Sequence, residues 1–211
     1  MTSVPKPLKF LRPHYPELQE VYEKWPSTSN ASGSSKSLFA DILSVLAMTY
    51  SDTGKRETLG YRLTGESEED PGTWGHEYVR HLAAEIEQEY AAKTEETSES
   101  KYTSAQLHAL ALRLVPFLLS HNGEADAVDL LLELESISSI IPFVDENTYA
   151  RVCLYMTSCV NLIMPPDDRE FLKCAREIYR KFEKYSQAIV CSLRLGDQEL
   201  IKEDFSTPKN S

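Results

Sequence analysis

The sequence predicts an all-α protein in which consecutive helical hairpins stack in the manner of an α-solenoid, preceded by an extended N-terminal arm. Apolar residues recur three and four residues apart over long stretches, which is the spacing of one helix face. The alternating pattern of β-strands is nearly absent, and only 8 glycines interrupt the 211 residues. A single such helix buries too little apolar surface to offset its ordering entropy, so each hairpin is expected to pack on the next.

The composition indicates a globular protein and argues against several functional classes. Hydrophobic residues make up 41% of the chain, and no apolar run approaches the ~20 residues of a membrane-spanning helix. A formal net charge of −11 without a basic patch argues against nucleic-acid partners. The four cysteines have no CxxC spacing and the start lacks a signal-type apolar stretch, which predicts reduced core cysteines in an intracellular protein.

Residues 1–100 are expected to form the N-terminal arm and a helical subdomain. Four prolines predict an extended chain before a short helix at about Glu17–Trp25, because proline lacks an amide and restricts its predecessor. These prolines are Pro5, Pro7, Pro13 and Pro16. The polar segment Ser27–Ser37 is predicted to be a flexible loop. A buried central helix should follow, with apolar side chains over most of its surface: Leu38, Phe39, Ile42, Leu43, Val45, Leu46 and Tyr50.

A second long helix is predicted to begin near Pro71, since proline suits the first helical turn. Its inward face should carry Trp74, Tyr78, Val79, Leu82, Ala83, Ile86 and Tyr90. The polar run Lys93–Lys101 then predicts an internal boundary. Acidic residues cluster on either side of this helix, and each cluster is either a solvated loop or a docking surface for a basic partner. The clusters are Glu66, Glu68, Glu69, Asp70 and Glu95, Glu96, Glu99.

Stacked hairpins are expected over residues 101–205, with a disordered tail at 206–211. Helices Gln106–Ser120 and Ala125–Glu135 flank a turn in which Gly123 should supply a left-handed residue. Pro116 lies inside the first of these helices and should kink it. A helix over Asn147–Ile163 should present Tyr149, Val152, Cys153, Met156, Cys159, Val160 and Ile163 on one face.

The last helices follow Pro165 and Pro166, which stop the preceding helix, and Asp167 or Asp168 should cap the next one. Its core face should be Phe171, Ala175, Ile178, Tyr179 and Phe182. The final hairpin, divided by Gly196, should present Ala188, Ile189, Leu193, Leu200, Ile201 and Phe205. No covering neighbour follows it in this sequence, so it is expected to open first or to self-associate.

Motifs for catalysis or metal binding are weak. His76, Glu77 and His81 resemble a zinc-binding HExxH helix, but a spacing of five turns the helix by about 500°, leaving the two imidazoles about 140° apart. The loops around Lys36 and Lys55 lack the order of a phosphate-binding loop and follow no predicted strand. The sequence therefore predicts no catalytic residue, no cofactor and no metal site, and it leaves partner-binding residues unknown.

Several strings, in their order along the chain, resemble the N-terminal region of the large non-ATPase base subunit of the proteasome regulatory particle. They are SVPKPLKFLRPHY, DILSVLAMT, WGHEYVRHLAAEI, ADAVDLLLELE, CLYMTSCVNLIMPPDD and KFEKYSQAIVCSLRLGDQELI, and together they span nearly the whole chain. The sequence departs from the family at Asp204–Ser211, which becomes polar where the family continues into helices, and in its long serine-rich segment at Ser27–Ser37.

The resemblance implies a non-catalytic scaffold in the cytoplasm and nucleus that supports ubiquitin-dependent degradation. Its implied partners are the ATPase-ring subunits and other regulatory-particle subunits. Docking of ubiquitin or ubiquitin-like receptors belongs to the family's downstream helical repeats, so it is implied only where those repeats are present. Two alternatives stay open: a free-standing helical-repeat adaptor, and a metalloenzyme built on His76, Glu77 and His81.

Overall fold

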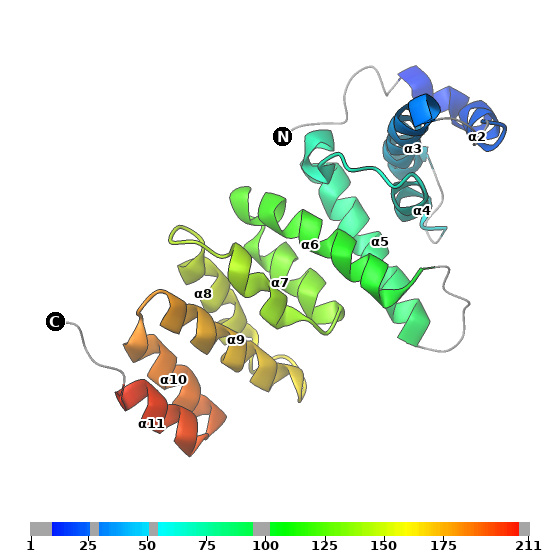
Figure 1. The fold of residues 1–211 in the computed structure, drawn as a ribbon. Coiled ribbons are helices and arrows are strands. Elements are labelled where there is room, and N and C mark those ends of the chain that lie inside the picture. Colours follow the sequence, from blue (N-terminus) through cyan, green and yellow to red (C-terminus); the bar gives the residue numbers. More distant parts are fainter. Residues whose placement is uncertain (1–9, 26–29, 51–54, 95–101, 207–211) are drawn as a thin grey trace. The chain divides into compact units, whose positions relative to one another are not determined.

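The computed structural model describes residues 10–25, 30–50, 55–94 and 102–206, and every regular element in these ranges is a helix (Figure 1). The predicted all-α fold class is confirmed. The chain divides into two compact units, Met1–Leu114 and Val115–Ser211, and the division falls within helix α6. The predicted boundary at Lys93–Lys101 and the predicted tail at 206–211 lie almost wholly outside the described residues, so both stay predictions.

In the described part of the first unit, the helical residues Phe10 and Leu11 lead into a short 3-10 helix, η1 (Arg12–His14), which is followed by α2 (Tyr15–Glu23). The prediction of an extended chain up to Pro16 is wrong for this stretch. Pro13 and Pro16 occupy the first turns of the two helices, where a missing amide costs nothing and the fixed φ suits the helix. Residues 1–9, the rest of the predicted arm, lie outside the described part.

Helix α3 (Asn30–Tyr50) is longer than predicted and includes most of the segment that was expected to be a loop. Its second half is buried against α2, α4 and α5, with Leu43, Leu46 and Ala47 inaccessible to solvent. Extending an established helix adds one backbone hydrogen bond per residue, so the packed half supports the polar half. Leu38 and Tyr50, predicted to be buried, are about half exposed.

Helix α4 (Glu57–Thr64) was not predicted, because its eight residues carry too short a periodic pattern. It packs on α3 and α5, and it buries Leu59 and Arg62. Gly65 ends it at a close approach between helices: a Cβ built there would lie 2.5 Å from the Cβ of Ala40 and 3.0 Å from the carbonyl oxygen of Tyr61. The absence of a side chain at residue 65 therefore sets the α3–α4 distance.

Gly65→Ala is expected to lower the free energy of unfolding by about 1 to 3 kcal/mol, because the added methyl group forces the two helices apart. Chemical denaturation followed by circular dichroism measures this. Gly60→Ala is the matched control, since its Cβ would meet only the hydroxyl of Tyr102 at 3.4 Å. Equal stability of the two variants would show that α3 and α4 can move apart to fit the methyl group without a loss of folding free energy.

The rest of the first unit consists of η2 (Pro71–Trp74), α5 (His76–Thr94) and the first part of α6 (Ser104–Ser120). The predicted start at Pro71 is confirmed for a helical turn, although Gly75 separates this turn from α5. The predicted face of α5 is buried at Tyr78, Val79, Leu82, Ala83 and Ile86. A capping box begins α6: Thr103 Oγ1 accepts the amide of Gln106 at 3.2 Å, and the Gln106 side chain accepts the amide of Thr103 at 2.9 Å.

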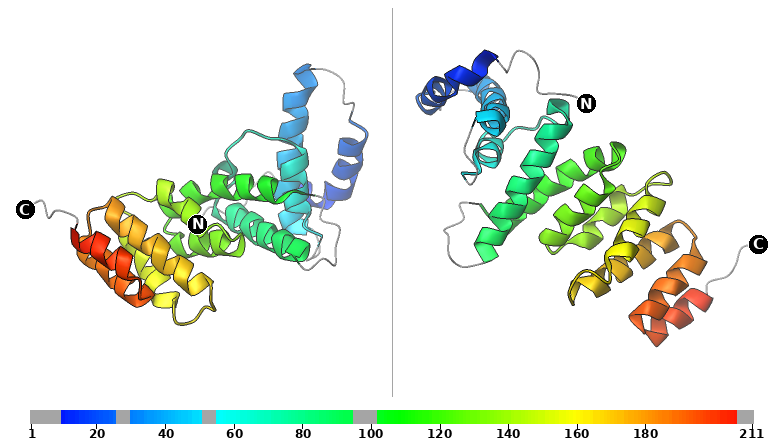
Figure 2. Two further views of the ribbon diagram at one scale, coloured as in Figure 1. Left: turned by 60° about the horizontal axis from the view of Figure 1, so that its bottom comes forward. Right: turned by 180° about the vertical axis from the view of Figure 1, so that it is seen from behind.

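The second unit stacks its helices in chain order (Figure 2). Successive neighbours pack together from α7 to α11, and the 3-10 helix η3 packs on α7 and α9. The elements are α7 (Glu124–Glu133), η3 (Ile137–Phe143), α8 (Tyr149–Cys159), α9 (Asp167–Lys181), α10 (Tyr185–Leu195) and α11 (Gln198–Ser206). The predicted hairpin stacking is confirmed here, whereas η3 was not predicted.

Four helices in this unit are followed by a residue with a left-handed backbone conformation, and only one of these four residues is a glycine. Asn122, Glu135, Glu183 and Gly196 have φ between 53° and 68°. After α7, for example, the amide of Glu135 donates to the carbonyl of Leu132 and the amide of Ser136 donates to the carbonyl of Leu131. These are the two hydrogen bonds of a Schellman motif. The prediction for Gly123 is wrong, because Gly123 has φ −97° and Asn122 takes the left-handed position.

Two predicted boundaries around α8 and α9 also need correction. Helix α8 ends at Cys159 rather than Ile163, because the amide of Leu162 turns back to the carbonyl of Cys159 at 2.7 Å. Helix α9 has Pro166 at its N-cap, so neither Asp167 nor Asp168 occupies the predicted capping position, although the carboxylate of Asp168 accepts the first-turn amide of Arg169 at 2.8 Å. Both aspartates lie in the first turn, where the helix dipole favours a negative charge.

Candidate functional site

A buried ion pair connects α3, α4 and the acidic loop at residues 66–70. Arg62 donates to Asp41 at 2.7 Å, and the two side chains are 1% and 0% exposed. Ser67 donates its hydroxyl to the second oxygen of Asp41, and Arg62 also donates to the carbonyl of Glu69. The loop is therefore anchored to the protein interior by an ion pair that is buried away from solvent.

Arg113, on α6, holds the same loop at its backbone. Its guanidinium donates to the carbonyls of Ser67 at 3.0 Å, Glu68 at 2.9 Å and Glu69 at 2.6 Å. Burial lowers the pKa of Arg113 from its ordinary value. With the carbonyls turned inward, the four acidic side chains of the loop are exposed around a hollow of about 510 Å³: Glu66, Glu68, Glu69 and Asp70.

The polar side of α5 holds the beginning of α4. Glu85 accepts the backbone amide of Leu59 at 2.7 Å, and His81 lies 3.0 Å from the other oxygen of the same carboxylate. Arg56 has a left-handed backbone, with φ 49°, and pairs with the buried Glu89 at 2.6 Å. Carboxylates near the first amides of a helix are favoured by its dipole, so these contacts fix the short helix in place.

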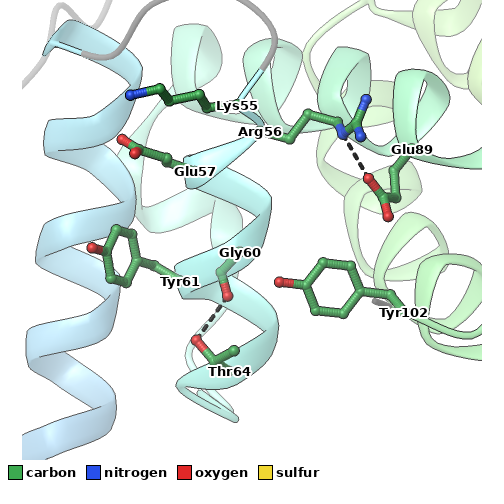
Figure 3. A pocket seen from close by; sticks show the side chains of 8 residues that line it. All are labelled: Lys55, Arg56, Glu57, Gly60, Tyr61, Thr64, Glu89 and Tyr102. Carbon is green, nitrogen blue, oxygen red and sulfur yellow. Dashed lines mark hydrogen bonds and ion pairs between the residues drawn. The ribbon is translucent and has the colours of Figure 1, made fainter. Parts of the chain in front are cut away.

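A hollow of about 280 Å³ lies beside α4 (Figure 3). Its walls are Lys55, Arg56, Glu57, Gly60, Tyr61, Thr64, Glu89 and Tyr102. Figure 3 shows Arg56 directed to Glu89, while Lys55 points away from both. Because the two cations diverge, they do not form a phosphate clamp. Thr53 and Gly54 of the Lys55 loop lie outside the described residues, so the expectation that this loop is no phosphate-binding loop stays a prediction.

The three residues of the zinc alternative do not form a ligand set. His76 is the first residue of α5, Glu77 is exposed, and His81 is engaged with Glu85. Within the described ranges, no group of three or more histidine, cysteine, aspartate or glutamate side chains is placed to hold a metal ion. In the same ranges, none of the helices is long and apolar enough to cross a membrane.

Three of the four cysteines of the second unit are buried in the core, as predicted. Cys153, Cys174 and Cys191 are buried and unpaired, and Cys159 is half-buried. Burial raises the pKa of Cys174 to about 12 and that of Cys191 to about 11. Since the thiolate is the reactive form, a raised pKa lowers the nucleophilicity of these two thiols at neutral pH.

The charged residues that organise both units were missed in the sequence, because they lie far apart along it. Arg62 and Arg113 belong to different helices, as do Arg176 and Asp204 in the second unit. One signal was present: Asp41 lies on a helix that is apolar nearly all round, and a buried charge requires a partner. The partner itself carried no local signal.

Comparison with known proteins adds a match along the full length. The sequence model described as RPN1 N-terminal domain covers residues 1–211. The chain belongs to this family. Among curated proteins, the RPN1 N-terminal domain seen here is 53% identical over 204 residues to "26S proteasome regulatory subunit rpn1" of Schizosaccharomyces pombe. The suspected family resemblance is thereby confirmed.

Two further relatives of this RPN1 N-terminal domain have somewhat lower sequence identity. The "26S proteasome non-ATPase regulatory subunit 2" of Dictyostelium discoideum is 46% identical over 211 residues, 100% of the chain. The "26S proteasome non-ATPase regulatory subunit 2 homolog B" of Arabidopsis thaliana is 44% identical over 98% of the chain. The S. pombe match covers 97% of the chain, and the chain spans 22% of the length of each of the three relatives.

Proposed function

We propose that this chain acts as the N-terminal scaffold segment of a non-catalytic subunit of the 26S proteasome regulatory particle, supporting ubiquitin-dependent protein degradation. The observation that carries the proposal is the family match over residues 1–211, together with relatives named as regulatory or non-ATPase subunits. The polar clusters of the described residues join helices to one another, which is a structural role that suits a scaffold.

The physical form suits a platform. Helices α7 to α11 pack in order, so each one offers an outer face while its inner face is covered by its neighbours. Large apolar side chains remain exposed on this unit at Leu154, Leu162, Met164, Val190, Leu193 and Phe205.

The proposed partners are the ATPase-ring subunits and other regulatory-particle subunits, in the cytoplasm and nucleus. Binding of ubiquitin or ubiquitin-like receptors is proposed only for proteins that also contain the downstream repeats of the family, since the chain corresponds to 22% of its relatives. No nucleic-acid, membrane or cofactor role is proposed. A free-standing adaptor is the alternative that the experiment must separate from the scaffold.

Affinity purification of the tagged protein from its own cells tests the proposal. We expect ATPase-ring subunits to be recovered in stoichiometric amounts and to co-sediment with the protein as a large particle. An acidic cytosolic protein with the same tag serves as the control for charge-driven recovery. Consistent absence of ATPase-ring subunits, with the protein sedimenting alone, would contradict the scaffold role and favour the adaptor.

A further inference from the structure

The second unit contains a hollow of about 450 Å³ between the end of α7, the start of η3 and the start of α9. Its apolar wall is formed by Leu132, Ile137 and Pro166, and three carboxylates surround it: Glu135, Asp167 and Glu170. The proposed scaffold role does not use this hollow, and none of the networks described above includes its carboxylates.

The charge in the hollow is poorly compensated. The side chains of Glu135 and Asp167 make no hydrogen bond or ion pair with another described residue. Glu170 pairs with Lys173 at 2.7 Å, but both side chains are about half exposed, and such surface pairs contribute little to stability. Among the described residues, Glu170 is thus the one carboxylate of the three with a cationic partner, and this exposed pair can exchange at low cost.

Two exposed apolar side chains belong to the segment of chain that leads into the hollow. Leu162 and Met164, in the α8–α9 connector, are 82% and 78% exposed, and Met164 precedes by two residues the Pro166 that lines the hollow. The connector is held by backbone hydrogen bonds from Leu162 to Cys159 and from Asp167 to Met164. Its apolar side chains are thus presented from a defined turn at the beginning of α9, where Figure 1 shows the connector at the edge of the stack.

We propose that this edge binds a segment of another protein in which a lysine or arginine lies beside a large apolar side chain. The cation enters the hollow among Glu135, Asp167 and Glu170, where it replaces missing counter-charge. The neighbouring apolar side chain covers Leu162 and Met164, whose burial drives association. Charge complementarity selects this occupant over an acidic segment, which the three carboxylates would repel.

The backbone supplies a variant that removes charge without harming the fold. Glu135 holds φ 53°, a conformation that glycine adopts at no steric cost, so Glu135→Gly deletes a carboxylate of the hollow while relieving strain. Glu183→Gly is the matched control. Glu183 is also an exposed glutamate at a left-handed helix end, with φ 57°, but it lies at the far end of α9 from the hollow.

The probe is a synthetic amphipathic helix of leucine and lysine, titrated at physiological salt into the isotope-labelled chain and followed by amide chemical shifts. We expect shifts confined to residues 132–138 and 162–170, and an affinity that falls about fivefold in Glu135→Gly. Leu162→Ser should weaken binding to a similar extent, Glu183→Gly should leave it unchanged, and both glycine variants should melt at or above the wild-type Tm. A leucine–glutamate helix of equal length should not bind.

Equal weakening by Glu135→Gly and Glu183→Gly would overturn the inference, because it would reduce binding to the general attraction of an acidic chain. Shifts centred elsewhere, equal binding of the leucine–glutamate helix, or self-association of the chain through Leu162 would overturn it as well. The inference does not depend on the scaffold role. Failure to recover proteasome subunits leaves the peptide result standing, and failure of the peptide leaves the assembly result standing.

Discussion

Arg62→Met is expected to lower the free energy of unfolding by about 3 to 5 kcal/mol, the cost of leaving a buried charge without its partner. Methionine keeps most of the side-chain volume of Arg62 but removes the guanidinium, so the carboxylate of Asp41 is left without its partner in a site that is closed to solvent. The Glu69 carbonyl also loses its donor from Arg62. Denaturation of the purified variant, followed by circular dichroism, measures the change.

Two comparisons separate the loss of the pair from a general effect of substitution. Lys24→Met removes one partner of the exposed Lys24–Glu20 pair and should change stability by less than about 1 kcal/mol. The double variant Asp41→Leu, Arg62→Met removes both buried charges and should recover part of the lost stability. A single Arg62→Met variant as stable as wild type would show that the pair contributes nothing to the fold.

Asp204→Ala is expected to release α11 from the stack, at a cost of about 3 kcal/mol. Arg176 donates to both oxygens of Asp204 at 2.7 and 2.9 Å, Ser192 donates to it at 2.6 Å, and Arg180 pairs with it as well. The cost should lie at the lower end of the range for buried pairs, because Arg176 keeps Glu177 and Glu203. Hydrogen exchange should show loss of protection over Gln198–Ser206 while α8 remains protected.

The control for this variant is Lys202→Ala, which removes an exposed pair with Glu199 from the same helix and should leave exchange in α11 unchanged. In the wild-type chain we expect α11 to exchange faster than α8, because α11 packs on α10 whereas α8 packs on both α7 and α9. Equal protection of α8 and α11 in a monodisperse monomer would contradict that prediction. Unchanged protection of α11 in Asp204→Ala would contradict the role assigned to the network.

The same carboxylate gives the second unit an acid dependence. Burial would raise the pKa of Asp204, but hydrogen bonds from Arg176, Ser192 and Arg180 outweigh it and hold the pKa below its usual value. A folded pKa below the unfolded one means that the stabilisation is complete above the unfolded value of about 3.9 and is lost as pH falls through the folded pKa. The stability difference between wild type and Asp204→Ala should therefore be constant at neutral pH and shrink in acid.

Most of the helices could be predicted from the sequence, because amphipathic spacing is a local property. The inward face of α5 and the buried cysteines of α8, α9 and α10 followed from spacing alone. Errors occurred where a short element or a turn depends on its neighbours. Helix α4 exists because α3 and α5 cover it, and the left-handed position fell on Asn122 because the closing hydrogen bonds, rather than the residue type, set the register of the turn.

The sequence alone determined the all-α class, the hairpin order and the family, since these depend on periodic apolar residues and on strings that can be compared directly. Only the tertiary structure decided which charges meet. Asp41 pairs with Arg62, Arg176 pairs with Asp204, and three carboxylates surround one hollow, although no spacing in the sequence indicates these contacts. The physical reason is that the buried face of a helix can be predicted from the apolar spacing within that helix alone, whereas an ion pair between helices depends on how several helices pack.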